Sequence, residues 1–292
     1  MIEARDRLAD ADIGAVTELI EVAARIDGVG ALSEQGFLQL RVGAPVAHLL
    51  LRRDGRIVGY AQLDPATGAA ELVVHPDHRR QGIGRALVAR LLADIHEPEL
   101  RIWAHGDLPA AQALAAAAGF ERVRSLWLMG RLLTDDLPLP EIPHGVVVDT
   151  FVLGADDDAW VELNARVFAD HPEQGRWSLD DLRDRTAEAW FDPAGFFVAR
   201  RGPSMVGFHW TKVPDESTGE VYVVGIDPTE RGHGLGKSLT LVGLHHLRDI
   251  GLDRAILYVD EDNQSAVRLY KDLGFERVGL DVMYARPPRS DV

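Results

Sequence analysis

The sequence predicts a mixed α/β fold in which one domain occurs twice. A glycine-rich loop at residues 79–84 (RRQGIG) has a counterpart at residues 231–236 (RGHGLG), 152 positions later. The segment GFERV occurs at both 119–123 and 274–278, 155 positions apart. Two matched landmarks in the same order, at nearly the same large separation, indicate two tandem domains rather than a short-period solenoid. In each half the loop follows a short apolar run and opens a helix-like stretch, as in a β-loop-α unit.

Composition restricts the classes of protein to which the chain can belong. Its 292 residues, with 46% hydrophobic and 26% charged side chains, suit two globular domains of ordinary size. A net charge of −15 argues against nucleic acid or an anionic membrane as a partner. The absence of cysteine excludes disulfides and a cysteine nucleophile, and His245 and His246 lack the spaced partners of a metal site, so we expect no metal. We find no signal-peptide pattern and expect a cytoplasmic protein, and a monomer.

Apolar periodicity and turn residues predict the elements of the first half. Apolar residues at helical spacing predict the first helix, and Asp54-Gly55 between two apolar runs predicts a hairpin. The predicted order is a helix at 10–26, hairpin strands at 48–53 and 57–63, a strand at 70–75, a helix after the glycine loop, a strand at 100–104, a helix at 109–118 and a strand at 121–131.

A proline-rich segment separates the two halves. Residues 134–145 (TDDLPLPEIPHG) have three prolines and little periodicity, so we expect domains at 1–134 and 146–292 with a linker at 135–145. The second half then repeats the order of the first. Its predicted elements are helices at 158–168 and 179–189, strands at 196–200, 206–213 and 220–226, a helix at 235–250, a strand at 255–259, a helix at 265–273 and a strand at 277–285.

The glycine loops have the composition of a pyrophosphate cradle. Residues without Cβ let a backbone approach phosphate oxygens, and the start of a helix directs N–H groups and a positive dipole end at an anion. Two better-known phosphate motifs do not fit. Residue 231 is Arg where a Walker A loop needs Gly, and the first copy has two glycines where a dinucleotide fingerprint needs three. The pattern in both copies, Arg/Gln-x-x-Gly-x-Gly/Ala, resembles the acyl-CoA loop of the GCN5-related N-acetyltransferases (GNAT family).

The second half carries the groups that acetyl transfer from a thioester to an amine requires: a base, a polarised carbonyl and a proton for the thiolate. Glu220 begins the strand before the loop and is the candidate base, while backbone N–H groups near 224–226 would meet the thioester carbonyl. Tyr270 is the candidate acid, in a helix that we expect Asn263 to cap. Two plainer interpretations stay open, with Glu220 a solvated strand-edge carboxylate and Tyr270 an amphipathic core residue.

The first half lacks these groups. At the two repeat offsets it has small or apolar residues in the corresponding places, namely Gly68, Leu108 and Ala115. The first copy therefore keeps a CoA-like loop without an acid or a base. We expect catalysis in the second domain and a non-catalytic first domain.

Longer segments resemble one branch of the GNAT family, the mycothiol synthases, which are tandem acetyltransferases of actinobacteria. The segments are LSEQ at 32–35, HPE at 171–173, RW at 176–177, TK at 211–212, GEVYVVGIDP at 219–228, YVD at 258–260 and the stretch 263–270. The resemblance covers nearly the whole chain and implies two tandem GNAT-like domains. It also implies transfer of acetyl from acetyl-CoA to the cysteinyl amine of cysteinyl-glucosaminyl-inositol (desacetylmycothiol), giving mycothiol and CoA.

The same resemblance implies roles for individual residues, with Tyr270 as the general acid. The first domain would hold a CoA through Leu72, Val73, Val74, Arg80, Gln81, Gly82, Ile83, Gly84 and Arg85. The second domain would hold the reactive acetyl-CoA through Val224, Gly225, Ile226, Arg231, Gly232, His233, Gly234, Leu235, Gly236, Lys237, Asn263, Gln264, Ser265, Ala266, Val267 and Arg268. The acceptor would be bound by Glu34, Glu173, Lys212, Glu220 and Tyr258.

Two other functions are to be distinguished from this one. A tandem acetyltransferase of the same fold could act on another amine, such as an aminoglycoside or a protein N-terminus. The mycothiol interpretation requires Glu34, Glu173 and Lys212 to converge on Glu220. A non-catalytic acetyl-CoA sensor would use both loops only for binding, and the retention of Glu220 and Tyr270 in one half disfavours it.

Overall fold

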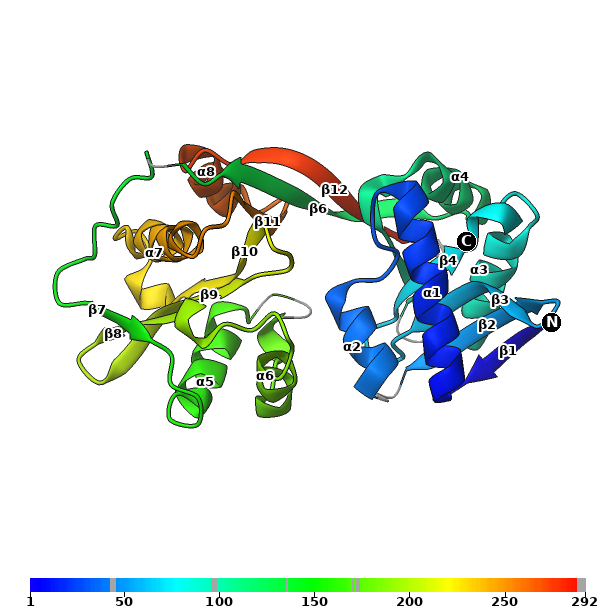
Figure 1. Cartoon of the computed structure of the whole chain (residues 1–292), viewed down its shortest axis with the longest axis horizontal. Helices are drawn as coiled ribbons and strands as arrows, with labels where there is room; N and C mark the ends of the chain where they lie inside the picture. Colours follow the sequence, from blue (N-terminus) through cyan, green and yellow to red (C-terminus); the bar gives the residue numbers. More distant parts are fainter. Residues whose placement is uncertain (43–45, 96–98, 135, 170, 172–173, 288–292) are drawn as a thin grey trace, which may run out of the picture. The chain divides into compact units, whose positions relative to one another are not determined.

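The computed structural model (Figure 1) describes residues 1–42, 46–95, 99–134, 136–169, 171 and 174–287. The chain divides into two compact units. The first comprises Met1–Trp127, Asp260–Asp262 and the described residues from Gly279 onward, and the second comprises Leu128–Val259 and Asn263–Val278. None of the helices in the described part combines the length and apolar character that a membrane span needs.

The first unit is a mixed sheet with the strand order β1-β2-β3-β4-β5-β12. Neighbouring strands are antiparallel except for the parallel pair β4 and β5. Its elements are β1 (Ile2–Arg5), α1 (Asp10–Asp27), α2 (Glu34–Val42), β2 (Ala47–Arg53), β3 (Arg56–Leu63), β4 (Ala69–Val74), the short helix η1 (Pro76–His78), α3 (Ile83–Asp94), β5 (Arg101–Ala104), η2 (His105–Asp107), α4 (Pro109–Ala118) and the end of β12 (Glu276–Ala285).

The second unit repeats this plan with the strand order β6-β11-β10-β9-β8-β7. Strands β7 to β10 pair antiparallel in succession, and β10 pairs parallel with β11. Its elements are the end of β6 (Glu121–Leu132), β7 (Val147–Thr150), α5 (Asp157–Val167), η3 (Gln174–Arg176), α6 (Leu179–Thr186), η4 (Pro193–Gly195), β8 (Phe196–Arg201), β9 (Ser204–Lys212), β10 (Thr218–Ile226), η5 (Pro228–Glu230), α7 (Leu235–Asp249), β11 (Arg254–Asp260) and α8 (Gln264–Asp272).

Each unit takes its last strand from the other half of the sequence. Residues 128–132 of β6 belong to the second unit, where β6 lies beside β11. Residues 279–285 of β12 belong to the first unit, where β12 pairs antiparallel with β5. The last strand of each sequence copy therefore completes the sheet of the other copy, an arrangement that neither periodicity nor turn residues can reveal.

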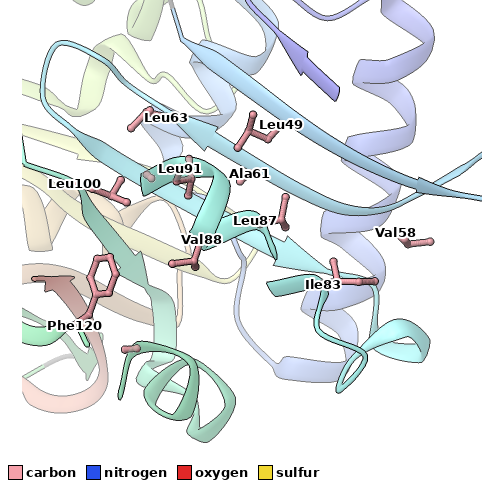
Figure 2. Close-up of a cluster of buried hydrophobic side chains, with 12 residues drawn as sticks. Leu49, Val58, Ala61, Leu63, Ile83, Leu87, Val88, Leu91, Leu100 and Phe120 are labelled. Atoms are coloured by element: carbon pink, nitrogen blue, oxygen red, sulfur yellow. The ribbon is translucent and has the colours of Figure 1, made fainter. Parts of the chain in front are cut away.

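Helices cover both faces of each sheet because successive strand residues point to opposite sides. In β2, Leu49 packs with α3 and α4 (Figure 2), whereas Leu50 packs with α1 and α2. In β8, Val198 packs with α5 and α6, whereas its neighbour Ala199 packs with α7. Each sheet is therefore buried on both sides, and each unit has a core of its own.

The structure confirms the predicted helices and strands. Besides the short helices η1 to η5, its described part has three further elements that the sequence pattern did not reveal. The hairpin forms at Asp54 and Gly55, whose φ values of +50° and +79° are left-handed. The added elements are β1, α2 and β7. β1 and β7 have only four residues each, too few for an alternation pattern. α2 contains Gly36, a weak helix former that is needed there because a Cβ would collide with the Glu71 carboxylate.

A buried histidine lies between two carboxylates in the first unit. His105, which follows β5, contacts Asp281 of β12 through Nδ1 and Glu71 of β4 through Nε2, both at 2.8 Å. Burial lowers the pKa of His105, but hydrogen bonds to Asp281 and Glu71, together with their charges, outweigh it and raise the pKa to about 10. The Ser33 N–H also donates to Glu71, and the Gly106 N–H to Asp281. The imidazolium thus links β4, the end of β5 and β12.

We expect His105→Gln to change how stability depends on pH. Because the folded-state pKa lies above the ordinary value of 6.5, the stabilisation is complete below about pH 6.5 and is lost as the pH rises toward about 10. Thermal denaturation of the wild type should show this decline, and His105→Gln should melt lower at neutral pH with a flatter profile. His144→Gln, at an exposed position, is the control. Parallel profiles for wild type and His105→Gln would contradict a protonated His105.

Candidate active site

The second unit contains parallel strands whose pairing stops early. The ladder between β10 and β11 consists of three residue pairs and ends at Glu220–Ile256. Both strands continue, β10 to Ile226 and β11 to Asp260. Over residues 221–226, β10 therefore keeps β9 on one edge, whereas on the other edge its ladder with β11 has ended and no other described strand pairs with it. The first unit is built alike, because β4 and β5 pair only at Ala69–Arg101 and Ala70–Ile102.

The open edge of β10 presents backbone donors. The N–H of Asp227 donates to Val206 on the β9 side, and N–H directions alternate along a strand. The N–H groups of Val224 and Ile226 therefore point to the open edge, whereas that of Gly225 points to β9. Of the three residues predicted to contact acyl-CoA here, two offer donors on the side where β11 no longer pairs.

A β-bulge lies beside Glu220. The register of β10 against β9 shifts between Val221 and Val223, which makes Tyr222 the extra residue. Both Tyr222 and Val223 consequently pack into the cluster beneath α5 and α6. In the first unit β4 pairs with β3 without such a shift. This difference is a structural asymmetry between the two copies.

The bulge also corrects one correspondence between the copies. Counted along the ladders, the residue of β4 that occupies the place of Glu220 is Ala69. The constant repeat offset had indicated Gly68, because it ignores the residue that the bulge adds. Ala69 carries no carboxylate, so the first copy still lacks a base at this place.

The glycine loop before α7 runs through left-handed backbone. Gly232 and Gly234 have φ values of +82° and +83°, and a Cβ at either would meet no atom within 4 Å. Helix α7 begins at Leu235, and no side chain caps its first N–H groups. Those donors and the positive end of the helix dipole are suited to an anion. The charged residues of the loop, Arg231, His233 and Lys237, are exposed around it.

The corresponding loop before α3 is similar but more strained. Gly82 has a φ of +81° and precedes α3, which likewise has no side-chain cap. At the position corresponding to Gly232, however, Arg80 has a φ of +61°. A left-handed residue other than Gly costs about 1 kcal/mol or more. The first loop therefore keeps the backbone shape of the second, although Arg80 is less suited than glycine to a left-handed conformation. Gln81 and Arg85 are exposed there, and Ile83 is buried in the core.

Glu220 and Lys212 face each other across the ladder between β10 and β9. Directly opposite residues share a face of the sheet, so the structure brings these two predicted acceptor contacts together. Glu220 is 8% exposed, and the Lys212 ammonium lies 4.7 Å from the centre of the Trp190 ring and 5.1 Å from that of Tyr222. Sequence reasoning did not single out Trp190 or Tyr222, because only the folded chain brings the segment after α6 beside β10.

Helix α8 carries the predicted acid. Asn263 accepts a hydrogen bond from the N–H of Ala266 at 3.2 Å, which confirms the predicted cap. Tyr270 lies edge-on to Phe275 with ring centres 5.9 Å apart. Burial raises the pKa of Tyr270 to about 12, so its hydroxyl keeps a proton that it can donate at neutral pH.

The remaining predicted acceptor contacts come from separate segments of the chain. Tyr258, in β11, is 46% exposed. Glu34 begins α2 in the first unit. Glu173 lies outside the described residues. Convergence of Glu34 and Glu173 on Glu220 therefore stays a prediction.

Comparison with known proteins decides the family. Residues 45–122 match the acetyltransferase (GNAT) domain and residues 160–275 the acetyltransferase (GNAT) family. Mycothiol acetyltransferase of Thermomonospora curvata is 56% identical, over 97% of this chain and 96% of that protein. Mycothiol acetyltransferase of Thermobispora bispora is 54% identical, over 98% of this chain and 99% of that protein. The chain belongs to the mycothiol acetyltransferases of the GNAT family.

The fold and cosubstrate predicted from the sequence are confirmed by this family membership. A tandem GNAT protein from the clavulanic acid biosynthesis pathway shares the fold, with a TM-score of 0.73 over 99% of this chain and 100% of that chain at 23% identity. Two tandem GNAT domains make the protein an acetyl-CoA-dependent N-acetyltransferase. The residues present fit that cosubstrate, because uncapped helix donors suit its pyrophosphate and an open strand edge suits its amide-bearing arm.

We expect Gly234→Ala to raise the KM for acetyl-CoA by about tenfold, because a left-handed Ala disfavours the loop conformation by 1–2 kcal/mol. The KM for the amine acceptor should change little. Gly82→Ala makes the same change at the same φ in the first copy, so it is the matched control, and turnover should persist. Steady-state kinetics with both substrates varied would test this pair. Equal effects of the two substitutions would contradict the assignment of chemistry to the second loop.

Proposed function

We propose that this mycothiol acetyltransferase-family enzyme transfers acetyl from acetyl-CoA to the cysteinyl amine of cysteinyl-glucosaminyl-inositol, giving mycothiol and CoA. The observation that carries the proposal is identity of 54–56% with curated mycothiol acetyltransferases over nearly the whole chain. The pairing of a buried carboxylate with a lysine beside the open strand edge supports it. We further propose that chemistry occurs in the second domain, with boundaries at 1–134, 135–145 and 146–292.

The proposed base is Glu220. Its carboxylate accepts the proton of the acceptor ammonium, directly or through water, and the freed amine nitrogen forms a bond to the thioester carbon. A carboxylate at the end of the β10–β11 ladder stands next to the strand edge that offers the N–H groups of Val224 and Ile226. Those donors would stabilise negative charge that develops on the carbonyl oxygen. Because the base and the N–H donors lie on the same strand, they hold the acceptor amine and the thioester carbonyl in fixed positions relative to each other.

The proposed acid is Tyr270. When the carbon–sulfur bond breaks, the electron pair goes to sulfur, the Tyr270 hydroxyl supplies a proton to sulfur, and the nitrogen loses its second proton to solvent to leave the neutral amide. A hydroxyl whose pKa is raised to about 12 by burial is protonated at every physiological pH. It regains its proton from solvent after the products leave. An acid of this kind imposes no alkaline limit on the rate near neutrality.

Acceptor binding is proposed for Glu34, Glu173, Lys212, Glu220 and Tyr258. Carboxylates suit the hydroxyls and ammonium of a polyol-bearing amine, and an ammonium suits its hydroxyl oxygens. The first domain is proposed to bind a CoA through its own loop without chemistry, because the counterparts of Glu220 and Tyr270 are Ala69 and Ala115. A cytoplasmic location, a monomeric state and the absence of nucleic-acid or membrane partners stay predictions from the sequence.

The function is tested with acetyl-CoA and purified cysteinyl-glucosaminyl-inositol. We expect an acetylated, thiol-bearing product from the wild type, and losses in kcat of about 100-fold or more for Glu220→Gln and Tyr270→Phe. Because the acceptor itself carries a thiol, the product should be measured by mass spectrometry rather than by release of thiol. Tyr270→Phe should lower the rate to the same extent at each pH across the neutral range.

Ala115→Ser and Ala69→Ser are controls at the corresponding positions of the first copy and should retain full turnover. No acetylated product from the wild type would overturn the proposed acceptor. Full rates in both Glu220→Gln and Tyr270→Phe would overturn the acid and base roles while leaving the acceptor intact.

A further inference from the structure

The ammonium of Lys212 lies close to two aromatic rings of the second unit. Lys212 Nζ lies 4.7 Å from the ring centre of Trp190 and 5.1 Å from that of Tyr222. The two rings meet edge to face, with centres 5.0 Å apart. A cation within about 6 Å of an aromatic face is attracted by the ring quadrupole, and more strongly where water is partly excluded. Lys212, Trp190 and Tyr222 are all half-buried, so both attractions act in a partly dry setting.

Tyr222 is itself fixed by a buried arginine. Arg185 Nε donates a hydrogen bond to the Tyr222 hydroxyl at 3.0 Å. The Arg185 guanidinium lies 3.8 Å from the ring centre of Trp177, and its Nη1 donates to the backbone oxygen of Asp181 at 3.1 Å. Only 3% of Arg185 is exposed. A planar guanidinium held on several sides leaves the hydroxyl, and hence the ring, little freedom to move.

Tyr222 and Glu220 lie two residues apart in β10, so strand alternation places both side chains on the face where Lys212 lies opposite Glu220. The bulge adds Val223 to that face beside Tyr222. In the first copy, β4 pairs without a bulge, and the residue two positions after Ala69 is Glu71, which is not aromatic. The arrangement of lysine and rings therefore occurs in the same copy as Glu220 and Tyr270.

We propose that Trp190 and Tyr222 are positioning residues that hold the Lys212 ammonium ready to donate hydrogen bonds to hydroxyls of the acceptor, with Arg185 fixing Tyr222. The inference rests on the proposed role of Lys212 in acceptor binding. A mobile lysine loses rotamer entropy when it binds a ligand, whereas one already held against two rings loses little.

A double-mutant cycle tests the proposal. Trp190→Leu removes one ring face and should raise the KM for cysteinyl-glucosaminyl-inositol about tenfold, with kcat and the KM for acetyl-CoA little changed. Trp190→Phe restores a ring and should recover most of the loss. Tyr222→Phe keeps the ring but removes the hydrogen bond from Arg185, and should raise the same KM to a smaller extent. In a Lys212→Met background, Trp190→Leu should have no further effect on the acceptor KM.

The outcomes separate this proposal from the function on which it rests. A wild-type acceptor KM for Lys212→Met would overturn the proposed contact of Lys212 with acceptor. A raised KM for Lys212→Met, with the full Trp190→Leu effect persisting in that background, would overturn the positioning role and leave the function standing. Trp103→Leu is the matched control, because Trp103 is a half-buried tryptophan of the first unit with Arg124 5.3 Å from its ring centre. It should leave the acceptor KM unchanged, and thermal melting of each variant checks that it is folded.

Discussion

The site depends on one edge of strand β10 that, among the described residues, is not paired with another strand beyond Glu220. β10 and β11 share three ladder pairs, and from Glu220 onward β10 extends to Ile226 without β11 beside it in the ladder. Backbone donors inside a folded protein need partners, and two N–H groups of β10 point to this edge. An extended ligand with amide groups can pair with such an edge as a further strand would. The site is thus prepared by sheet topology before any side chain contributes.

The two units share this scaffold but differ in the residues placed on it. Both units have a short parallel ladder, a left-handed glycine and an uncapped helix N-terminus. Strand β10 has a bulge that β4 lacks, and this bulge separates the open edge from Glu220 by one added residue. The Lys212 ammonium lies 5.1 Å from the centre of the Tyr222 ring, which has no counterpart in the described part of the first unit. The first unit has Ala69 in place of the carboxylate, and a buried imidazolium with two carboxylates at the end of β4 and β5. His105 has both ring nitrogens engaged, so it offers no lone pair to act as a base.

The features that could be predicted from the sequence are those that depend on residues close together in the chain. Helices with apolar residues at regular spacing, the Asp54-Gly55 hairpin and the Asn263 cap were all predictable, because each follows from neighbours in the chain. The bulge was not predictable, since it depends on how β10 aligns with β9. Because the bulge adds a residue to β10, the constant repeat offset indicated Gly68 as the counterpart of Glu220, whereas the ladders give Ala69. The two aromatic rings near Lys212 come from β10 and from the segment after α6, and only the folded chain brings them together.

The exchange of last strands gives the first half of the sequence a structural part in the second sheet. β11 provides one side of the open edge, and its other neighbour is β6, which comes from the first half of the sequence. Without the first half, β11 would become an edge strand with a row of unpaired backbone groups. The position of β11 relative to β10, which defines where pairing stops after Glu220, would then lose its support on the far side. What the first half supplies to the second sheet is therefore backbone, and this contribution does not depend on what the first glycine loop binds.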